Sequence, residues 1–236
     1  MSDNAGMMTS RLPTLFISHG APTFALEPGL AGANLTALGR TLPRPEAVLV
    51  VSPHWMTRGL RVATTAHPET VHDFGGFDPA LYEIRYPAAG HPHLAQRALE
   101  LLRAAGLDAQ DDPHHGLDHG AWVPLLHLYA QADVPVFQVS LPTMFDEDAA
   151  WALGRALAPL AEEGALIVGS GSLTHNLHDV FAGDGRERPY VAEFVSWVHE
   201  AVHAGDGDRL RRTLRDAPHA RRAHTTTDHF FPLLVA

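Results

Sequence analysis

The chain contains no cysteine among its 236 residues. That absence excludes a disulfide framework, cysteine-based zinc or iron–sulfur sites, and a thiol nucleophile. Basic residues are also scarce, because 17 of them stand against 27 acidic residues and the formal net charge is −10. No basic run stands out, so we expect no nucleic-acid partner. One arginine cluster is interpreted as the solvated face of a helix and its exit loop: Arg209, Arg211, Arg212, Arg215, Arg221 and Arg222.

Long hydrophobic runs are absent as well. No apolar run approaches the roughly 20 residues that a helix needs to cross a membrane. The first residues lack the basic-then-apolar order of a signal peptide, so residues 1–11 are expected to be a disordered leader. We therefore expect a cytoplasmic protein without membrane contact, either a monomer or a homodimer.

Predicted strands and helices alternate along the rest of the chain. Residues 47–52 and 165–169 are continuous apolar runs, which are typical of strands buried on both faces. The pattern predicts one three-layer α/β domain over residues 12–236, with a central mixed, largely parallel sheet and helices on both faces. Further strands are expected at 14–18, 60–65 (beside 47–52), 134–140 and from 231 to 236, and helices at 30–40, 93–105, 121–129, 146–160, 190–203 and 208–214.

Histidine, in contrast, is abundant, with 17 copies. Four of them lie where a predicted strand or element ends. In an open α/β sheet, ligands bind just outside the carboxyl ends of the strands, and imidazoles brought there from distant parts of the chain can bind one metal ion. The sequence therefore predicts a mononuclear metal enzyme built on His19, His54, His175 and His229.

Six segments that contain these histidines, or lie between them, occur in order from residue 14 to the end of the chain. They are Ser18-His19-Gly20-Ala21-Pro22, Ser52-Pro53-His54-Trp55, Asp73-Phe74-Gly75-Gly76-Phe77, Gly116-Leu117-Asp118-His119-Gly120-Ala121-Trp122, Gly169-Ser170-Gly171-Ser172 with Thr174-His175-Asn176, and Asp228-His229-Phe230. Together they resemble the class III extradiol ring-cleavage dioxygenases of the LigB-like superfamily, and most of all their DOPA-4,5-dioxygenase branch. Each segment alone is a weak signal, whereas six in order are a specific one.

The resemblance implies a role for each of five histidines. His19, His54 and His229 would bind the metal, and His175 would be the catalytic base or an additional metal ligand. His119 would line the pocket as a second catalytic residue, an acid or proton relay. The implied reaction inserts both atoms of O2 into a catechol, DOPA-like or otherwise substituted, and gives a muconic semialdehyde. The family also implies a further strand beyond His229.

The expected cofactor is one mononuclear divalent metal. Ring cleavage of this kind needs Fe(II) with open positions, because catecholate and O2 bind the same ion. The third ligand position matches a histidine and not the glutamate of protocatechuate-type relatives, and three neutral imidazoles also suit Zn(II). Fe(II) is therefore expected for activity, with Zn(II) as an alternative bound metal. Ser172, Thr174 and Asn176 are placed to orient the ligands.

Other chemistries stay open or are disfavoured. A zinc-dependent hydrolase or amidase could use the same histidines, and a non-catalytic metal-binding protein is a third interpretation. The loop that begins at Gly169 is no nucleophile elbow, since Leu173 replaces the last glycine of Gly-x-Ser-x-Gly. No Walker lysine follows it, and no His-Glu-x-x-His motif occurs. His115 is expected in a loop, and His224 either faces the substrate or has no role.

Overall fold

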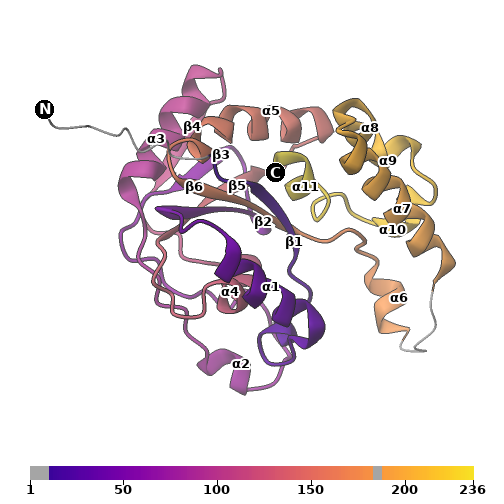
Figure 1. Ribbon diagram of the computed structural model, residues 1–236, viewed down its shortest axis with the longest axis horizontal. Helices are drawn as coiled ribbons and strands as arrows, with labels where there is room; N and C mark the ends of the chain where they lie inside the picture. Colours follow the sequence, from indigo (N-terminus) through magenta and orange to yellow (C-terminus); the bar gives the residue numbers. More distant parts are fainter. Residues whose placement is uncertain (1–10, 183–187) are drawn as a thin grey trace, which may run out of the picture.

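A six-stranded sheet forms the centre of the structure, a computed structural model that describes residues 11–182 and 188–236 (Figure 1). Residues 1–10 of the expected leader lie outside the described residues. The strands lie side by side in the order β1-β6-β2-β5-β3-β4. Their bounds are Thr14–Ser18 (β1), Ala47–Thr57 (β2), Leu60–Ala63 (β3), Ala109–Asp112 (β4), Val136–Pro142 (β5) and Ala165–Gly171 (β6).

Strands β1, β6, β2 and β5 are mutually parallel, and β3 pairs antiparallel with β5 and parallel with β4. The predicted mixed, largely parallel sheet is thus confirmed. The neighbours of β2 are β5 and β6, so the expectation that residues 60–65 lie beside 47–52 is wrong. Along β2, Leu49 and Val51 belong to one core cluster and Val48 and Val50 to the other. Both faces of this strand are buried, which explains its unbroken apolar run.

Helices cover both faces of the sheet and complete the three predicted layers. Helices α3, α5 and α11 lie on one face, α1 and α4 on the other, and α6 to α10 form a group at one end (Figure 1). The α-helices are Gly29–Thr41 (α1), Ala80–Glu83 (α2), Pro92–Ala104 (α3), His119–Leu128 (α4), Glu147–Leu157 (α5), Leu177–Phe181 (α6), Pro189–Ala204 (α7), Gly207–Arg211 (α8), Thr213–Asp216 (α9), Ala220–Ala223 (α10) and Phe231–Val235 (α11), with short 3-10 helices at Pro22–Ala25 and Ala158–Ala161.

Three sequence-based expectations about these elements are wrong. Where a strand was expected from 231 to 236, residues 231–235 form the helix α11. Its Pro232 is tolerated in the first turn of a helix, where the missing N–H has no partner to lose. The expected helix at 208–214 is divided into α8 and α9 at Arg212. Strand β4 was not predicted, because its sequence Ala-Gln-Asp-Asp has no apolar alternation.

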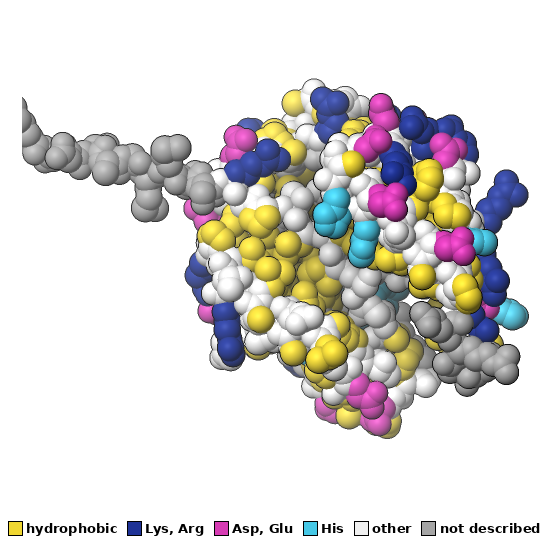
Figure 2. Space-filling view, turned by 45° about the vertical axis from the view of Figure 1, so that its right-hand side comes forward, with side chains coloured by type: hydrophobic (Ala, Val, Ile, Leu, Met, Phe, Trp, Pro, Cys, Tyr) yellow, Lys and Arg dark blue, Asp and Glu magenta, His cyan; other side chains and the backbone are white. Residues whose placement is uncertain are grey.

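Four arginines of the cluster near the C-terminus are exposed, as predicted, whereas Arg209 and Arg211 are half-buried, and most members of the cluster pair with acids. Arg209 bonds to Glu200 at 2.9 Å, Arg211 bonds to Asp148 at 2.9 Å, and Arg212 lies 3.3 Å from an Asp216 oxygen. Basic and acidic side chains are interspersed on the face drawn in Figure 2. The helices that the structure describes include none that is long and apolar enough to cross a membrane.

Candidate metal centre

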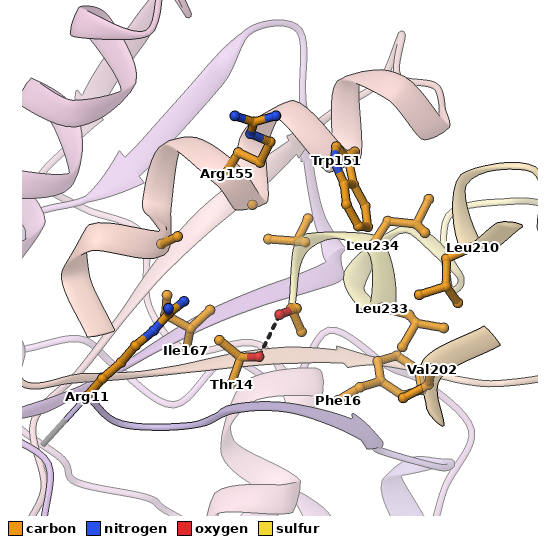
Figure 3. Close-up of a pocket in the computed structure, with 14 residues that line it drawn as sticks. Arg11, Thr14, Phe16, Trp151, Arg155, Ile167, Val202, Leu210, Leu233 and Leu234 are labelled. Carbon is orange, nitrogen blue, oxygen red and sulfur yellow. Dashed lines mark hydrogen bonds between the residues drawn. The ribbon is translucent and has the colours of Figure 1, made fainter. Parts of the chain in front are cut away.

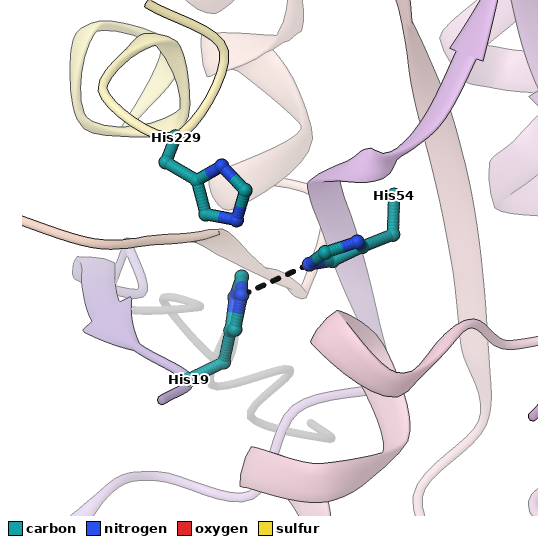
Figure 4. Close-up of side chains that lie close together, drawn as sticks. All are labelled: His19, His54 and His229. Carbon is teal, nitrogen blue, oxygen red and sulfur yellow. Dashed lines mark hydrogen bonds between the residues drawn. The ribbon is translucent and has the colours of Figure 1, made fainter. Parts of the chain in front are cut away.

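Three histidines from distant parts of the chain meet at the carboxyl edge of the sheet (Figure 4). His19 follows β1, and His54 lies in β2 where its register with β5 is interrupted. His229 lies in the loop before α11. Each offers one ring nitrogen, and these three atoms lie within 4.8 Å of one another. The predicted convergence of imidazoles therefore holds for these three residues, although His229 precedes a helix and does not follow a strand.

Hydrogen bonds fix the His19 ring so that Nε2 is its free nitrogen. The hydroxyl of Ser170 donates to the carbonyl of Gly120, so its oxygen accepts the Nδ1–H of His19, 2.9 Å away. In a neutral imidazole the other nitrogen then carries a lone pair. That atom, Nε2, lies 3.1 Å from Nε2 of His54. Two nitrogens that share one tetrahedral ion at about 2.0–2.1 Å are separated by about 3.3 Å.

A carboxylate orients the ring of His229, and another lies near the ring of His54. The Nδ1 of His229 donates to Asp228, 2.6 Å away, which leaves Nε2 as its free nitrogen. The Nδ1 of His54 lies 3.6 Å from a carboxylate oxygen of Asp73. Metal-binding histidines usually donate their second N–H to such a partner, which fixes the tautomer. The donor set, three imidazoles of which His19 and His229 are held by outer hydrogen bonds, fits a divalent transition metal.

Burial favours the neutral form of His19 and His54. Burial, reinforced by the neighbouring histidines, lowers the pKa of His19 well below its ordinary value. Burial also lowers the pKa of His54, to about 3, with further lowering by His119 and His229. For Asp228, burial raises the pKa, but the hydrogen bonds from His229 and Thr226 and the charge of His229 together outweigh it, and the net pKa is depressed. Neutral imidazole is the form that binds metal, so no proton competes at these two rings at neutral pH.

His175 lies against the cluster but outside the group of three. Its imidazole is stacked on that of His229, with ring centroids 3.5 Å apart and planes 7° apart. Its Nδ1 is buried without a hydrogen-bond partner, so Nε2 is the ring atom left for proton transfer. Burial, with a contribution from His229, lowers the pKa of this imidazole. A neutral ring beside the three nitrogens is suited to accept a proton.

His119 lies on the opposite side of the cluster, at the first position of α4. Its ring centroid is 3.8 Å from that of His54 and 5.5 Å from that of His19. Asp73 accepts from both the backbone N–H and Nδ1 of His119, at 2.8 Å each. Burial raises the pKa of Asp73, but the hydrogen bonds from His119 outweigh it and the net pKa is lowered. The carboxylate thus faces His119 in its charged form.

A buried polar network supports α4 beneath this histidine. Asp118 caps the helix by accepting from the backbone of Ala121, and the same oxygen accepts from the hydroxyl of Ser52 at 2.8 Å. Its other oxygen accepts from Gln138 at 2.7 Å. Burial raises the pKa of Asp118. This network ties the start of α4 to β2 and β5, and so places His119 beside His54.

Two residues that were expected to orient the histidine ligands, Ser172 and Asn176, bond to the backbone. Ser172 donates to the backbone of Thr174, and Asn176 caps α6 and donates to the carbonyl of Arg222. Asp73, Ser170 and Asp228 bond to the rings instead. All three lie within the six segments quoted above, so their place in those segments was the available signal.

Aromatic side chains of the loop between β3 and α3 flank His119. Phe74 lies edge-on to His119 at 5.7 Å between ring centroids, and Phe77 and Tyr82 pack on Phe74 at 5.5 and 5.3 Å. His115, expected in a loop, stacks on Trp55 at 3.7 Å. The loop thus supplies an apolar wall beside the cluster.

A sizeable cavity lies elsewhere, between β1, α5 and α11 (Figure 3). It measures about 390 Å³, and none of the five histidines lines it. Its walls are mostly apolar, with Arg11 and Arg155 at one end, and Thr14 bonds to the carbonyl of Ala236 across it. The titratable groups described above are at the sheet edge, so this cavity is not the candidate site.

Comparison with known proteins decides the family. A protein-family model described as "catalytic LigB subunit of aromatic ring-opening dioxygenase" matches residues 14–236 of this chain. The chain belongs to this LigB family. It is 41% identical to the 4,5-DOPA dioxygenase extradiol of Escherichia coli, over 97% of this chain and 85% of that protein. The protein of the same name from Beta vulgaris is 39% identical, over 94% of this chain and 85% of that one.

The fold of the LigB family is seen in a solved relative. The crystal structure of an uncharacterised protein from Escherichia coli K12 superposes with a TM-score of 0.77 at 33% identity, covering 95% of this chain and 87% of that chain. The family and these relatives show an extradiol dioxygenase of the DOPA-dioxygenase branch, as the six segments predicted.

Proposed function

We propose that this LigB-family enzyme opens the ring of a catechol, DOPA-like or otherwise substituted, with a mononuclear Fe(II) held by His19, His54 and His229, and that the product is a muconic semialdehyde. The observation that carries the proposal is the meeting of three ring nitrogens within 4.8 Å at the carboxyl edge of the sheet, flanked by two further imidazoles. The relatives named 4,5-DOPA dioxygenase extradiol support the substrate class.

The protein residues divide into a binding set and a proton-transfer set. When bound, the metal would supply Lewis acidity towards the catechol oxygens and, as Fe(II), electrons towards O2. His175 is proposed to take the proton of a catechol hydroxyl at Nε2, since its Nδ1 is buried. His119 is proposed to hold and return a proton at Nε2, since its Nδ1 is engaged by Asp73.

Substrate orientation is assigned to the loop that carries Phe74, Phe77 and Tyr82. These rings form an apolar wall next to His119. An aromatic substrate packed there would leave its polar edge towards the histidines, as expected of a pocket that is mostly apolar with few polar groups. The wall also limits the access of water to the reacting ring.

Oxygen uptake after anaerobic metal loading tests this function. Apoprotein loaded with Fe(II) is given a panel of catechols that includes DOPA, and uptake is followed together with the yellow ring-opened product. We expect one O2 consumed for each product formed, and loss of both in His54→Ala. His203→Ala, at an exposed position on α7, is the matched control.

The metal identity is tested in the same experiment. Three neutral imidazoles also suit Zn(II), so a zinc-loaded sample is measured in parallel. Zn(II) cannot supply electrons to O2, and the zinc sample should therefore bind metal without turnover. If no catechol supports uptake with Fe(II), while the zinc sample hydrolyses amide or ester substrates, the hydrolase interpretation replaces this one.

A further inference from the structure

His224 is a buried histidine outside the five considered so far. Its side chain packs against the rings of Phe194 and Phe230, at centroid distances of 5.6 and 5.3 Å, and the residue is only 5% exposed. Of its two interpretations from the sequence, a substrate-facing residue or none, neither matches a side chain enclosed in this way. A buried polar group usually has a definite hydrogen-bonding role.

That role is a single hydrogen bond to the loop after β6. Nε2 of His224 lies 2.8 Å from the carbonyl oxygen of Leu173. A carbonyl only accepts, so Nε2 carries the proton and donates it. Nδ1 is buried and has no partner, which excludes a second polar contact within the described residues. Burial lowers the pKa of His224 to about 4, and the ring is therefore neutral at neutral pH.

The backbone beside His224 holds the same loop at two more points. The N–H of His175 donates to the carbonyl of Ala223 at 2.7 Å, and residues 175 and 224 form an isolated parallel bridge. The side chain of Asn176 donates to the carbonyl of Arg222 at 2.8 Å. Residues 222–224 thus hold residues 173–176 through three successive hydrogen bonds. The one to the Leu173 carbonyl is made by the side chain of His224.

The loop held by these contacts carries His175, whose backbone is fixed but whose ring has no hydrogen bond at Nδ1. The polar atom Nδ1 of His175 has no hydrogen-bond partner, and its ring is held by stacking on His229. The Leu173 carbonyl lies two residues before it, so a change at this carbonyl alters the backbone that presents the ring. Proton transfer needs donor and acceptor within hydrogen-bond reach, and small displacements are costly.

We propose that His224 is a positioning residue for His175: its Nε2–H holds the Leu173 carbonyl and so keeps the imidazole of His175 flat on that of His229. The expected effect on kcat rests on the proposed proton-transfer role of His175. The expected effect on the position of its ring does not. No contact between His224 and substrate is required.

Two variants, which carry the same amide group on side chains of different length, test the hydrogen bond from residue 224 to the Leu173 carbonyl. In His224→Gln the amide nitrogen reaches the place of Nε2 and can donate to Leu173. In His224→Asn it reaches only the place of Nδ1 and cannot. We expect kcat in His224→Asn to fall at least tenfold with KM and iron content unchanged, and kcat in His224→Gln to stay within about threefold of the parent enzyme.

A third variant, His224→Phe, keeps the ring volume and removes the donor, and it should behave like His224→Asn. His203→Phe is the matched control, because His203 is exposed on α7 and bonds only within its own helix. Equal kcat in the Gln and Asn variants overturns the proposal. So does a loss of iron or a rise in KM that accounts for the whole effect, since that indicates a general structural role.

A readout without turnover separates this proposal from the proposed function. In the metal-free protein labelled at histidine, the ring protons of His175 are shifted by the ring current of the stacked His229. That shift should be kept in His224→Gln and lost in His224→Asn. If it is lost as expected while no catechol is turned over by the parent enzyme, the positioning role stands and the dioxygenase proposal fails. If the shift is unchanged in both variants, the positioning role fails.

Discussion

Asp73 accepts two hydrogen bonds from His119, one from the backbone N–H to Oδ1 and one from ring Nδ1 to Oδ2, each of 2.8 Å. The two residues are 46 positions apart and belong to different elements. This pairing fixes which nitrogen of His119 carries its proton and leaves Nε2 towards the remainder of the cluster.

Replacement of Asp73 should therefore slow the reaction without removing the metal. In Asp73→Asn the backbone bond can persist, but the amide NH2 donates to Nδ1 and moves the ring proton to Nε2. We expect kcat to fall by about 10- to 100-fold, with iron content unchanged by metal analysis. Asp78→Asn is the control in the same loop, since the side-chain oxygen of either aspartate or asparagine at this position can accept from the backbone N–H of Ala80. Unchanged kcat in Asp73→Asn would show that the pairing is not used.

Removal of Asp118 should destabilise the fold. Its carboxylate is enclosed and accepts from Ser52, Gln138 and the backbone of Ala121. Asp118→Ala leaves these donors unpaired and removes a helix cap, so we expect a loss of about 2–4 kcal/mol in the free energy of unfolding. Urea denaturation followed by circular dichroism measures it. Asp146→Ala, at the exposed cap of α5, should cost about 1 kcal/mol. Equal costs at the two caps would contradict the role given to the network.

A side chain at Gly171 should displace His229. A Cβ added there would lie 2.3 Å from the carbonyl oxygen of His229, which is well inside van der Waals contact. In Gly171→Ala the loop must move away from β6, and we expect weaker iron binding together with lower kcat. Metal titration of the apoprotein measures the first effect. The control is Gly59→Ala, where nothing lies within 4 Å of the added atom. Parent-like iron affinity in Gly171→Ala would show that the loop is free to shift.

Metal binding should stabilise the protein through the three-histidine group. A ligand that binds only the folded state at about 100 times its Kd adds about 2.7 kcal/mol, which corresponds to a rise in Tm of about 5–10 °C for a chain of this size. Differential scanning fluorimetry with Fe(II) under anaerobic conditions, or with Zn(II), measures it. The rise should vanish in His54→Ala and persist in His203→Ala. An equal rise in both variants would place the metal elsewhere.

Sequence patterns were sufficient to predict an element and its site residue where an apolar run was followed closely by a histidine. The buried strand at β2 and the imidazoles at His19 and His54 could be predicted because an apolar run ends in a histidine, and such ends meet at one edge of a parallel sheet. The same reasoning failed at residues 231–236. A short apolar run fits a buried helix as well as a strand, and here packing against α5 and β6 decided for the helix.

Partners of the site histidines were harder to predict than the histidines. Ser172 was chosen because it is close to His175 in sequence, yet its hydroxyl bonds to the backbone of the same loop. The oxygen that holds His119 comes from Asp73, across a separation that no local pattern encodes. Only the folded chain brings such pairs together. The stacking of His175 on His229 is likewise a product of tertiary packing.

The sequence positions of the three proposed ligands determine how much of the chain a bound metal would restrict. His19 follows the first strand and His229 precedes the last helix, so one ion would join the two ends of the polypeptide in the manner of a cross-link. A bond that closes a long loop restricts the unfolded chain more than one that closes a short loop. Loss of the metal would then loosen first the short α11 segment. Protease sensitivity near the C-terminus would become a measure of metal occupancy.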